Sequence, residues 1–395
     1  MKYISIITAV FAGLMLFSCE KEVSEAQSES FLKMYGSKGV DRAKGVVVLE
    51  DGGYAICGTD STAQGSKMML ILTDEYGNVK DGFPKYYPEG DENAGANAIV
   101  AKNGGRNGFL LSGYIEDVSG DRDIFVVKTS ADGSENWSKS YGSAEDEEAL
   151  HAAEGINYEF ILAGYQEKLG EKDIMIMLVD QNGDSIPLSL FYTKPEDSKD
   201  AAANYILNDG DNYMCVATYN KFIGEGTDIL VLNFDDDLSP NDKILEGAYD
   251  EFGKCIIKED ENVFVVLGNS DNTQTGNSEI LLYQVESDGF LIKNERLLAT
   301  ISEPGVDLMA ERLVKMEGGK HAIVGTRQSD GNADILLQFM SDLKEDIRKT
   351  YGSGGTQEGA DIAIPSMGGL VFIGDNGYEG NSMVSLIRTN ESGDF

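Results

Sequence analysis

The feature that most limits the fold of this chain is an internal repeat of about 52 residues, which runs from residue 31 to residue 395. Its clearest landmark is a short apolar run that closes on a small residue. The closing residues are Gly58, Gly113, Gly164, Ala217, Gly268, Gly325 and Gly374. Self-similarity at a period of roughly 20–50 residues is typical of architectures in which each repeat is one supersecondary unit that buries its apolar faces against its neighbours.

Two further landmarks keep step with the first. An acidic residue followed by isoleucine opens the next apolar run at Asp123, Asp173, Asp228, Glu279 and Asp334. Upstream, a large apolar residue stands four positions before a tyrosine, in the pairs Phe31/Tyr35, Phe83/Tyr87, Trp137/Tyr141, Leu188/Tyr192 and Ile347/Tyr351. Three landmarks in register indicate that the repeat reflects structure.

Each repeat contains about four strand signals. In the first repeat they are residues 45–50, 54–58 and 67–73, followed by an outer strand, with turns at 51–53 and 74–77. The runs are 4–8 residues long and rich in Val, Ile, Phe and Tyr, and no helical period persists. Their continuous apolar character predicts burial on both faces. We therefore expect an all-β fold, a seven-bladed β-propeller of four-stranded antiparallel blades.

The two ends of the repeat region predict how the ring closes. The last repeat has its third strand at residues 383–389 but no outer strand, while residues 31–36 form a spare outer-strand motif. Pairing this N-terminal strand with the last blade removes an open edge. Residues 31–395 are thus predicted to be a single domain. A small residue in each inner strand is expected where strands crowd near the axis: Ala43, Gly95, Ala149, Ala201, Gly253, Ala310 and Gly359.

Residues 1–18 have the pattern of a signal peptide. Tyr3 to Phe17 is a 15-residue apolar stretch, which is shorter than the roughly 20 residues of a membrane span and fits the apolar region of a secretory signal. The stretch ends in Leu16-Phe17-Ser18-Cys19, which resembles a bacterial lipobox. The resemblance implies cleavage before Cys19 and lipidation of its sulfur; the alternative is an ordinary signal peptide with an incidental cysteine. Residues 19–30 then form a flexible polar tether.

The acidic start after Cys19 resembles the surface-export signal of Bacteroidota lipoproteins. This implies an outer-membrane lipoprotein at the cell surface, with a periplasm-facing position as the alternative. Asp and Glu total 68 against 32 Lys and Arg, a formal charge of −36. So acidic a surface repels nucleic acid and anionic lipid, so we expect membrane contact only through the lipid on Cys19.

The whole repeat pattern resembles the seven-bladed-propeller repeats of bacterial secreted proteins and surface lipoproteins. It runs W-x-x-x-Y-G, an acidic and a small residue, D-G-G-Y-x-x-x-G, D-I with an apolar run, and D-x-x-G. The resemblance covers residues 31–395. It is specific for the fold and weak for function.

Tyrosines provide the main candidate ligand site. Tyr114, Tyr165 and Tyr219 are expected to begin the loops between second and third strands in three successive blades, and Tyr378 lies four residues after Gly374. Tyrosines stack on sugar rings and hydrogen-bond with their hydroxyls. We expect a carbohydrate or peptide site here; the alternative is packing between blades.

Acidic residues offer two weaker sites. The loops that lead into the inner strands carry repeated acids, which would hold a cation or a basic partner, or simply cap turns: Asp41, Asp91, Glu92, Asp146, Glu147, Glu148, Asp197, Asp200, Asp250, Glu251, Asp307, Glu358 and Asp361. Asp180, Asn182 and Asp184 have the spacing that starts a calcium loop but lack its downstream glutamate. A plain β-turn is the alternative.

Catalysis has little support in the sequence. His151 and His321 are the only histidines, and nucleophile-elbow, zinc-protease, P-loop and dinucleotide motifs do not occur. We expect no cofactor and a monomeric binding module for a protein or glycan partner. The main alternative is a polysaccharide hydrolase or lyase with its site at the central channel, and a third interpretation is a scaffold in a surface complex with no small ligand. A channel with two convergent carboxylates would favour the enzyme.

Overall fold

A computed structural model describes residues 30–36, 39–90, 92–186, 190–192, 198–221, 226–352 and 354–395. For residues 190–192, 198–199 and 221 only the backbone is described. The signal peptide, Cys19, Asp91, Leu188 and Asp197 lie outside the described residues. Within the described part, nearly all regular structure is β-strand, and the one helical turn is η1 (Glu317–Gly319). No helix found there is long and apolar enough to cross a membrane.

Consecutive strands pair antiparallel in groups of four. Group 1 is β2 (Val40–Val48), β3 (Tyr54–Thr62), β4 (Gly65–Thr73) and β5 (Lys85–Tyr87). Group 2 is β6 (Asn93–Ala101), β7 (Phe109–Glu116), β8 (Arg122–Thr129) and β9 (Glu135–Tyr141). Group 3 is β10 (Glu147–Glu154), β11 (Phe160–Lys168), β12 (Glu171–Val179) and β13 (Leu190–Tyr192). Group 4 is β14 (Ser198–Asn208), β15 (Tyr213–Lys221), β16 (Thr227–Phe234) and β17 (Asn241–Leu245).

The C-terminal half continues this pattern. Group 5 is β18 (Asp250–Asp260), β19 (Val263–Asn272), β20 (Asn277–Ser287) and β21 (Ile292–Ile301). Group 6 is β22 (Asp307–Lys315), β23 (Lys320–Ser329), β24 (Asn332–Ser341) and β25 (Lys344–Tyr351). Group 7 is β26 (Thr356–Ala363), β27 (Leu370–Tyr378), β28 (Asn381–Thr389) and, from the other end of the chain, β1 (Phe31–Tyr35).

The groups are not all separate sheets. Groups 2 to 5 are four-stranded sheets of their own, whereas groups 6, 7 and 1 form one twelve-stranded sheet. Single parallel bridges join that sheet, Ala333 opposite Thr356 and Val40 opposite Ser382. No sheet among the described residues closes on itself. The antiparallel pair of β1 and β28 places Phe31 opposite Arg388 and Tyr35 opposite Val384.

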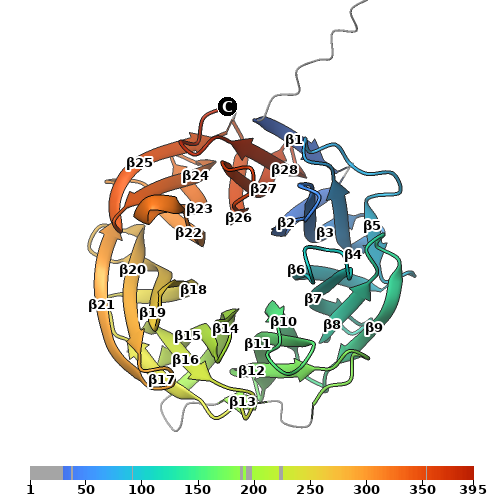
Figure 1. The fold of residues 1–395 in the computed structure, drawn as a ribbon, viewed down its shortest axis with the longest axis horizontal. Helices are drawn as coiled ribbons and strands as arrows, with labels where there is room; N and C mark the ends of the chain where they lie inside the picture. Colours follow the sequence, from blue (N-terminus) through green and yellow to red (C-terminus); the bar gives the residue numbers. More distant parts are fainter. Residues whose placement is uncertain are drawn as a thin grey trace, which may run out of the picture.

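The first strand of each group lies innermost around a common axis, as β2, β6, β10, β14, β18, β22 and β26 show in Figure 1. The fourth strands lie at the periphery. We call the side that carries the hairpins between second and third strands the upper face. The side that carries the hairpins between first and second strands is the lower face.

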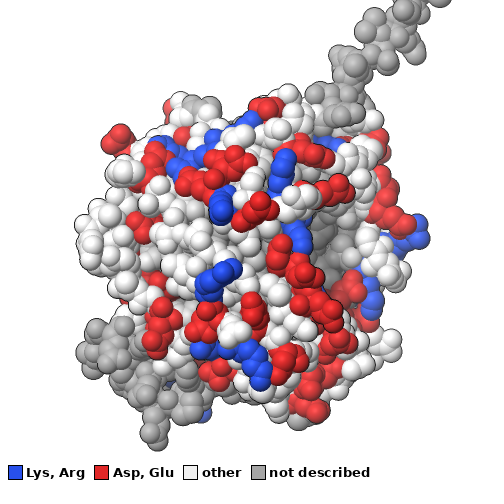
Figure 2. Space-filling view, turned by 60° about the vertical axis from the view of Figure 1, so that its left-hand side comes forward, with Lys and Arg blue, Asp and Glu red and all other residues white. Residues whose placement is uncertain are grey.

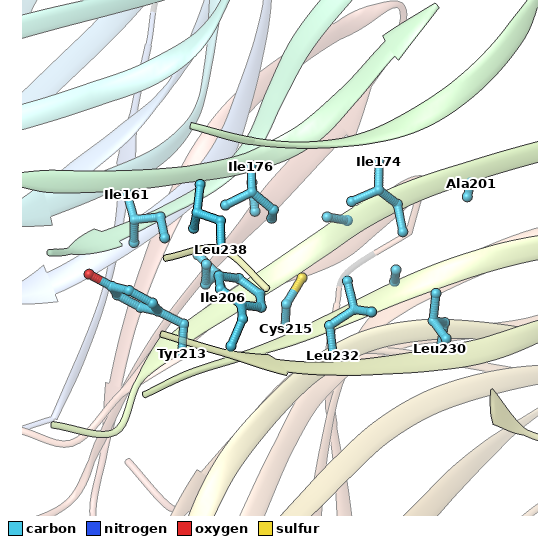
Figure 3. Packing of buried hydrophobic residues seen from close by; sticks show 14 of the residues in the cluster. Ile161, Ile174, Ile176, Ala201, Ile206, Tyr213, Cys215, Leu230, Leu232 and Leu238 are labelled. Atoms are coloured by element: carbon cyan, nitrogen blue, oxygen red, sulfur yellow. The ribbon is translucent and has the colours of Figure 1, made fainter. Parts of the chain in front are cut away.

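The core is divided among the junctions between neighbouring groups. At the junction of groups 3 and 4, Ile161 and Ile176 pack against Tyr213, Cys215 and residues of β16 (Figure 3). The junction of groups 7 and 1 has the same kind of cluster, with Ile373 and Leu386 against Val46 and Ile56. The second and third strands of a group are therefore apolar on both faces, which explains the continuous apolar runs in the sequence, whereas outer strands such as β21 and β25 are largely exposed.

A β-bulge recurs in the innermost strand of every group. One residue is left unpaired between two paired ones, for example Lys44 between Ala43 and Gly45. The bulged residues are Lys44, Asn97, Leu150, Asn204, Lys254, Glu311 and Ala360. Bulges of this kind re-aim side chains and are common near functional sites.

The bulge explains the landmark glycines. A Cβ added to Gly113 would overlap the carbonyl oxygen of Gly95, and one on Gly164 would overlap that of Glu148. Glycine is needed because the bulge brings a backbone carbonyl into the space of a side chain.

The predicted column of small residues lies in the innermost strands, and in two groups its member is not the residue paired with the landmark. The residue opposite the landmark is Ala96 rather than Gly95 in group 2, and Ala203 rather than Ala201 in group 4. These alanines are fully buried within the sheet. The neighbouring strand therefore sets their small size more directly than crowding at the axis does.

Candidate functional site

The seven bulged residues converge on one cavity at the upper end of the axis. The cavity has a volume of about 620 Å³, and every bulged residue lines it. Bulging turns these side chains out of the ladder and toward the axis, so each group supplies one residue to a shared wall. Loops do not build this site; the innermost strands position it rigidly.

Charged groups in the upper cavity are mostly paired with each other. The Lys254 ammonium lies 2.8 Å from a carboxylate oxygen of Glu311. Arg42, on the rim, lies 3.2 Å from Asp375, whose other oxygen accepts the Ala43 N–H at 2.6 Å. Lys44 and Glu358 are exposed and have no ion-pair partner among the described residues. They are the groups in this cavity that are free to meet a ligand charge.

Burial raises the pKa of Asp375 to about 6, against the lowering effects of the Ala43 N–H and of Arg42. A carboxyl with such a pKa could act as a general acid. However, its two oxygens are already held by Ala43 and Arg42. We therefore assign Asp375 a structural role between groups 7 and 1.

A layer of four side chains, which we call the axial layer, lies below this cavity. It contains His151, Tyr205, Arg312 and Asp361, the residues that follow the bulges in groups 3, 4, 6 and 7. The His151 and Tyr205 rings stack with centroids 3.9 Å apart. The Arg312 guanidinium lies 5.1 Å from the Tyr205 ring and 3.8 Å from Asp361.

Two of the predicted tyrosines make cation–π contacts with basic side chains of the neighbouring strand. Tyr114 and Tyr165 lie within β7 and β11, not in loops, because both strands continue several residues past the landmark glycine. The Arg122 guanidinium lies 4.3 Å from the Tyr114 ring, and the Lys172 ammonium 3.7 Å from the Tyr165 ring. The Tyr165 hydroxyl also donates to Glu148 at 3.0 Å, and only 6% of this residue is exposed.

The other two tyrosines differ from each other. Tyr219 lies one position farther along its strand than Tyr114 and Tyr165, and 2% of it is exposed, within the cluster between groups 3 and 4. Tyr378 is 65% exposed and lines a smaller cavity that shares Glu358 and Asp375 with the upper cavity. The four tyrosines therefore do not form one exposed surface. Tyr378 alone of the four lies beside the upper cavity.

The repeated acids mostly hold neighbouring groups together. The Asp146 carboxylate accepts the Arg122 N–H at 3.0 Å, so the start of one inner strand is tied to the third strand of the preceding group. The same contact recurs in the pairs Asn93–Ser66, Asp200–Lys172, Asp250–Thr227 and Asp307–Ser278. At the two remaining junctions a backbone bridge does this, which explains the twelve-stranded sheet.

Other acids cap the loops that lead into the inner strands. Glu147 accepts the Ser143 N–H at 2.8 Å. In group 5, Glu251 is 3% exposed and accepts the Tyr283 hydroxyl at 3.0 Å. Burial raises the pKa of Glu251 to about 7, and the nearby Asp228 adds to the rise. Hydrogen bonds to turns and to neighbouring groups thus account for six of the predicted acids, which are Asp146, Glu147, Asp200, Asp250, Glu251 and Asp307.

Asp180, Asn182 and Asp184 form a turn on the lower face. Asp180 accepts the backbone N–H groups of Asn182 and Asp184 at 2.8 and 2.9 Å. These hydrogen bonds hold the pKa of Asp180 below its usual value. Asp184 pairs with Lys139. Within the described ranges, no group of three or more His, Cys, Asp or Glu residues is placed to hold a metal ion.

His321 lies away from the axis. It is 1% exposed, and its Nε2 lies 2.7 Å from Glu259. Its burial and its contact with Glu259 indicate a structural role for His321. His151 belongs to the axial layer, and burial lowers its pKa well below the ordinary value.

Surface charge is mixed but dominated by acids. Figure 2 shows acidic side chains spread over one side of the molecule, with basic side chains scattered among them. This matches the formal charge of −36. Sequence reasoning missed the bulged residues, although each directly follows the small residue that pairs with a landmark, which is glycine in six groups and Ala217 in group 4.

No protein-family model matches the sequence, and no curated protein is similar to it in sequence. Similar solved structures exist. One, from a study of two prolyl endopeptidases, has 11% identity and a TM-score of 0.50, covering 90% of this chain and 48% of that chain. Another, a protein of unknown function from Dyadobacter fermentans, has 7% identity and a TM-score of 0.50, covering 90% and 97%.

A third similar structure is the β-propeller domain of the Trilobed protease from Pyrococcus furiosus, with 8% identity and a TM-score of 0.48, covering 90% and 96%. This chain spans about half the length of the prolyl endopeptidase chain. At such identities the likeness concerns the fold alone. The protein is an all-β chain whose structural neighbours include β-propeller proteins.

Proposed function

We propose that the chain is a seven-bladed β-propeller that binds a protein or glycan partner through its upper axial cavity. The strand groups are the blades, and β1 completes the last of them. The pairing of β1 with β28 and the apolar cluster between groups 7 and 1 support closure of the ring. A closed ring leaves only outer edges exposed to solvent.

The observation that carries the binding function is the convergence of the seven bulged residues on one cavity. Lys44 and Glu358 come from neighbouring inner strands and offer one cation and one anion to the same ligand. Polar groups at fixed positions on rigid strands give orientation and specificity. Tyr378, on the rim, adds an exposed aromatic face to the same region.

A hydrolase or lyase in the channel is less well supported. Four carboxyl groups line the upper cavity, from Asp271, Glu311, Glu358 and Asp375. Glu311 and Asp375 are in ion pairs, and Asp271 accepts the Ser278 hydroxyl at 2.8 Å. This leaves Glu358 without the second carboxylate that glycosidases use.

We also propose that lipid on Cys19 attaches the protein to the outer membrane, at the cell surface. Cleavage before Cys19 would leave a tether that ends where β1 begins. The Cys19→Ser variant tests this, because it should move from the membrane fraction to the soluble fraction. Continued membrane association of that variant would contradict lipid attachment.

The binding function can be tested with glycan arrays and protein pull-downs. The double variant Lys44→Ala/Glu358→Ala should lose captured ligands at least tenfold. The control variant Lys344→Ala/Glu391→Ala makes the same change of charge at exposed positions outside the upper cavity, and should keep them. Equal capture by both variants would contradict the assignment. Release of sugar from a bound polysaccharide, lost in Glu358→Gln, would favour the enzyme.

A further inference from the structure

A second cavity, of about 610 Å³, lies below the axial layer and opens toward the lower face. Part of its wall is aliphatic and comes from the later residues of the inner strands, while Glu154, Asn208 and Asp361 add polar groups. The aliphatic part includes Val46, Val48, Ile99, Leu207 and Ile362. Arg312 lines both this cavity and the upper one, so the axial layer lies between the two cavities.

The end of the lower cavity that the axial layer forms is rich in hydrogen-bond donors. His151 accepts the Ile206 N–H on Nδ1 at 3.3 Å. Burial lowers the pKa of His151 and keeps the ring neutral, so its proton must lie on Nε2. No described residue accepts a hydrogen bond from that nitrogen.

Arg312 has donors to spare as well. Its Nη1 donates to the Glu311 carbonyl at 2.9 Å. Its Nε lies 3.8 Å from Asp361, which is too far for a good hydrogen bond. Asp361 instead accepts the N–H groups of Val46 and Ile362 at 2.8 and 2.9 Å. Since a guanidinium has five N–H donors, most of those of Arg312 have no acceptor in the described part of the chain.

An aliphatic wall next to the unused hydrogen-bond donors of Arg312 and His151 suits one kind of ligand. We propose that the lower cavity binds a small aliphatic carboxylate, with its apolar tail toward the lower face and its carboxylate on Arg312 and His151. Small-molecule sites combine such walls with a few convergent polar groups, and cavities of roughly 300–1,000 Å³ hold them. A carboxylate matches a guanidinium in geometry and charge. This site lies on the opposite side of the axial layer from the upper cavity and does not depend on the function proposed for it.

The two histidines allow a direct test in the full chain. Hexanoate is titrated into protein labelled with ¹³C at histidine Cε1, and hexan-1-ol serves as a probe with the same tail and no carboxylate. Hexanoate should shift the His151 signal in a saturable manner and leave that of His321, which lies outside this cavity, unchanged. Hexan-1-ol should bind at least tenfold more weakly. An unmoved His151 signal, equal shifts of both signals, or equal binding of the two probes would overturn the proposal.

Variants add a second readout. Arg312→Gln should weaken hexanoate binding at least tenfold, because it removes the charge and most donors. Lys44→Gln is the matched control, since it removes a cation from the upper cavity only. It should leave binding within twofold. Equal effects of the two substitutions would overturn the proposal, and if Arg312→Gln does not fold, the comparison of the two probes in the unaltered protein decides.

Discussion

The hydroxyl of Tyr35, in β1, donates a 2.7 Å hydrogen bond to the carbonyl oxygen of Gly77, in the turn after β4. The same link joins neighbouring groups elsewhere, in the pairs Tyr87–Gly133, Tyr141–Gly183 and Tyr351–Gly393. We call this hydrogen bond a latch. It joins the landmark tyrosine of one group to the glycine of the turn that follows the third strand of the next group. Leu245 and Ile301 stand at the equivalent position in groups 4 and 5 and cannot donate.

Removing one latch should lower stability without changing the fold. We expect Tyr87→Phe to reduce the free energy of unfolding by about 1 kcal/mol, because a buried hydrogen bond is lost and the Gly133 carbonyl loses its partner. Tyr86→Phe is the control, since Tyr86 is 41% exposed in the same strand. Urea unfolding of both variants checks this. Equal midpoints for the two would show that the latch contributes nothing.

Glu251 should make stability depend on pH. Its pKa is raised from 4.5 to about 7 in the folded protein. The folded state therefore binds the proton more tightly. The contribution of Glu251 to stability is complete below about pH 4.5 and is lost as pH rises through 7, by roughly 3 kcal/mol. Glu251→Gln should flatten this fall, and Gln357 shows that the equivalent site of group 7 accepts glutamine. Unfolding measured between pH 4 and 8 tests it; an unchanged slope would refute the assignment.

The landmark glycines should not tolerate a side chain. Gly113→Ala places a Cβ on the Gly95 carbonyl oxygen, and we expect a loss of about 1–3 kcal/mol from the forced backbone shift. Group 4 naturally has Ala217 at this position. Ala217→Gly should therefore cost no more than about 1 kcal/mol. Thermal unfolding of the two variants compares them, and similar losses would argue against the role of the bulge.

The side chains that accept a backbone N–H of the preceding group, such as Asp250, should need a hydrogen-bond acceptor but no charge. Asp250→Asn should retain the bond to the Thr227 N–H, as Asn93 does with Ser66, whereas Asp250→Ala should lose about 1 kcal/mol or more. Since these carboxylates are occupied by backbone groups, a chelator should not change the melting temperature. A melting point that falls on chelation would restore the calcium or cation hypotheses for these acids.

Much of the fold could be predicted because the second and third strands of each group are continuous apolar runs, and because turns such as residues 51–53 and 74–77 carry Asp and Gly. The strand pattern of the first repeat and the partner of Phe31–Tyr35 came from such local signals. The single bridges that merge groups 6, 7 and 1 into one sheet depend on whether a side chain or a carbonyl accepts one N–H. The sequence does not show that difference.

The candidate site was harder to predict. Tyr165 and Tyr219 were expected in loops, but their strands continue past the landmark and bury them. The upper cavity is lined by bulged residues as different as Leu150, Lys254 and Ala360. Their common role depends on backbone geometry rather than residue type, so no motif reveals it.

The proposed closure of the ring depends on the pairing of β1 with β28. Hydrogen–deuterium exchange of the native protein tests this most directly, with the outer strand β9 (Glu135–Tyr141) as the reference. We predict that the amides of Phe31–Tyr35 that bond to β28 exchange as slowly as the paired amides of β9. Exchange of these amides at the rate of an unstructured peptide would contradict the proposed closed propeller.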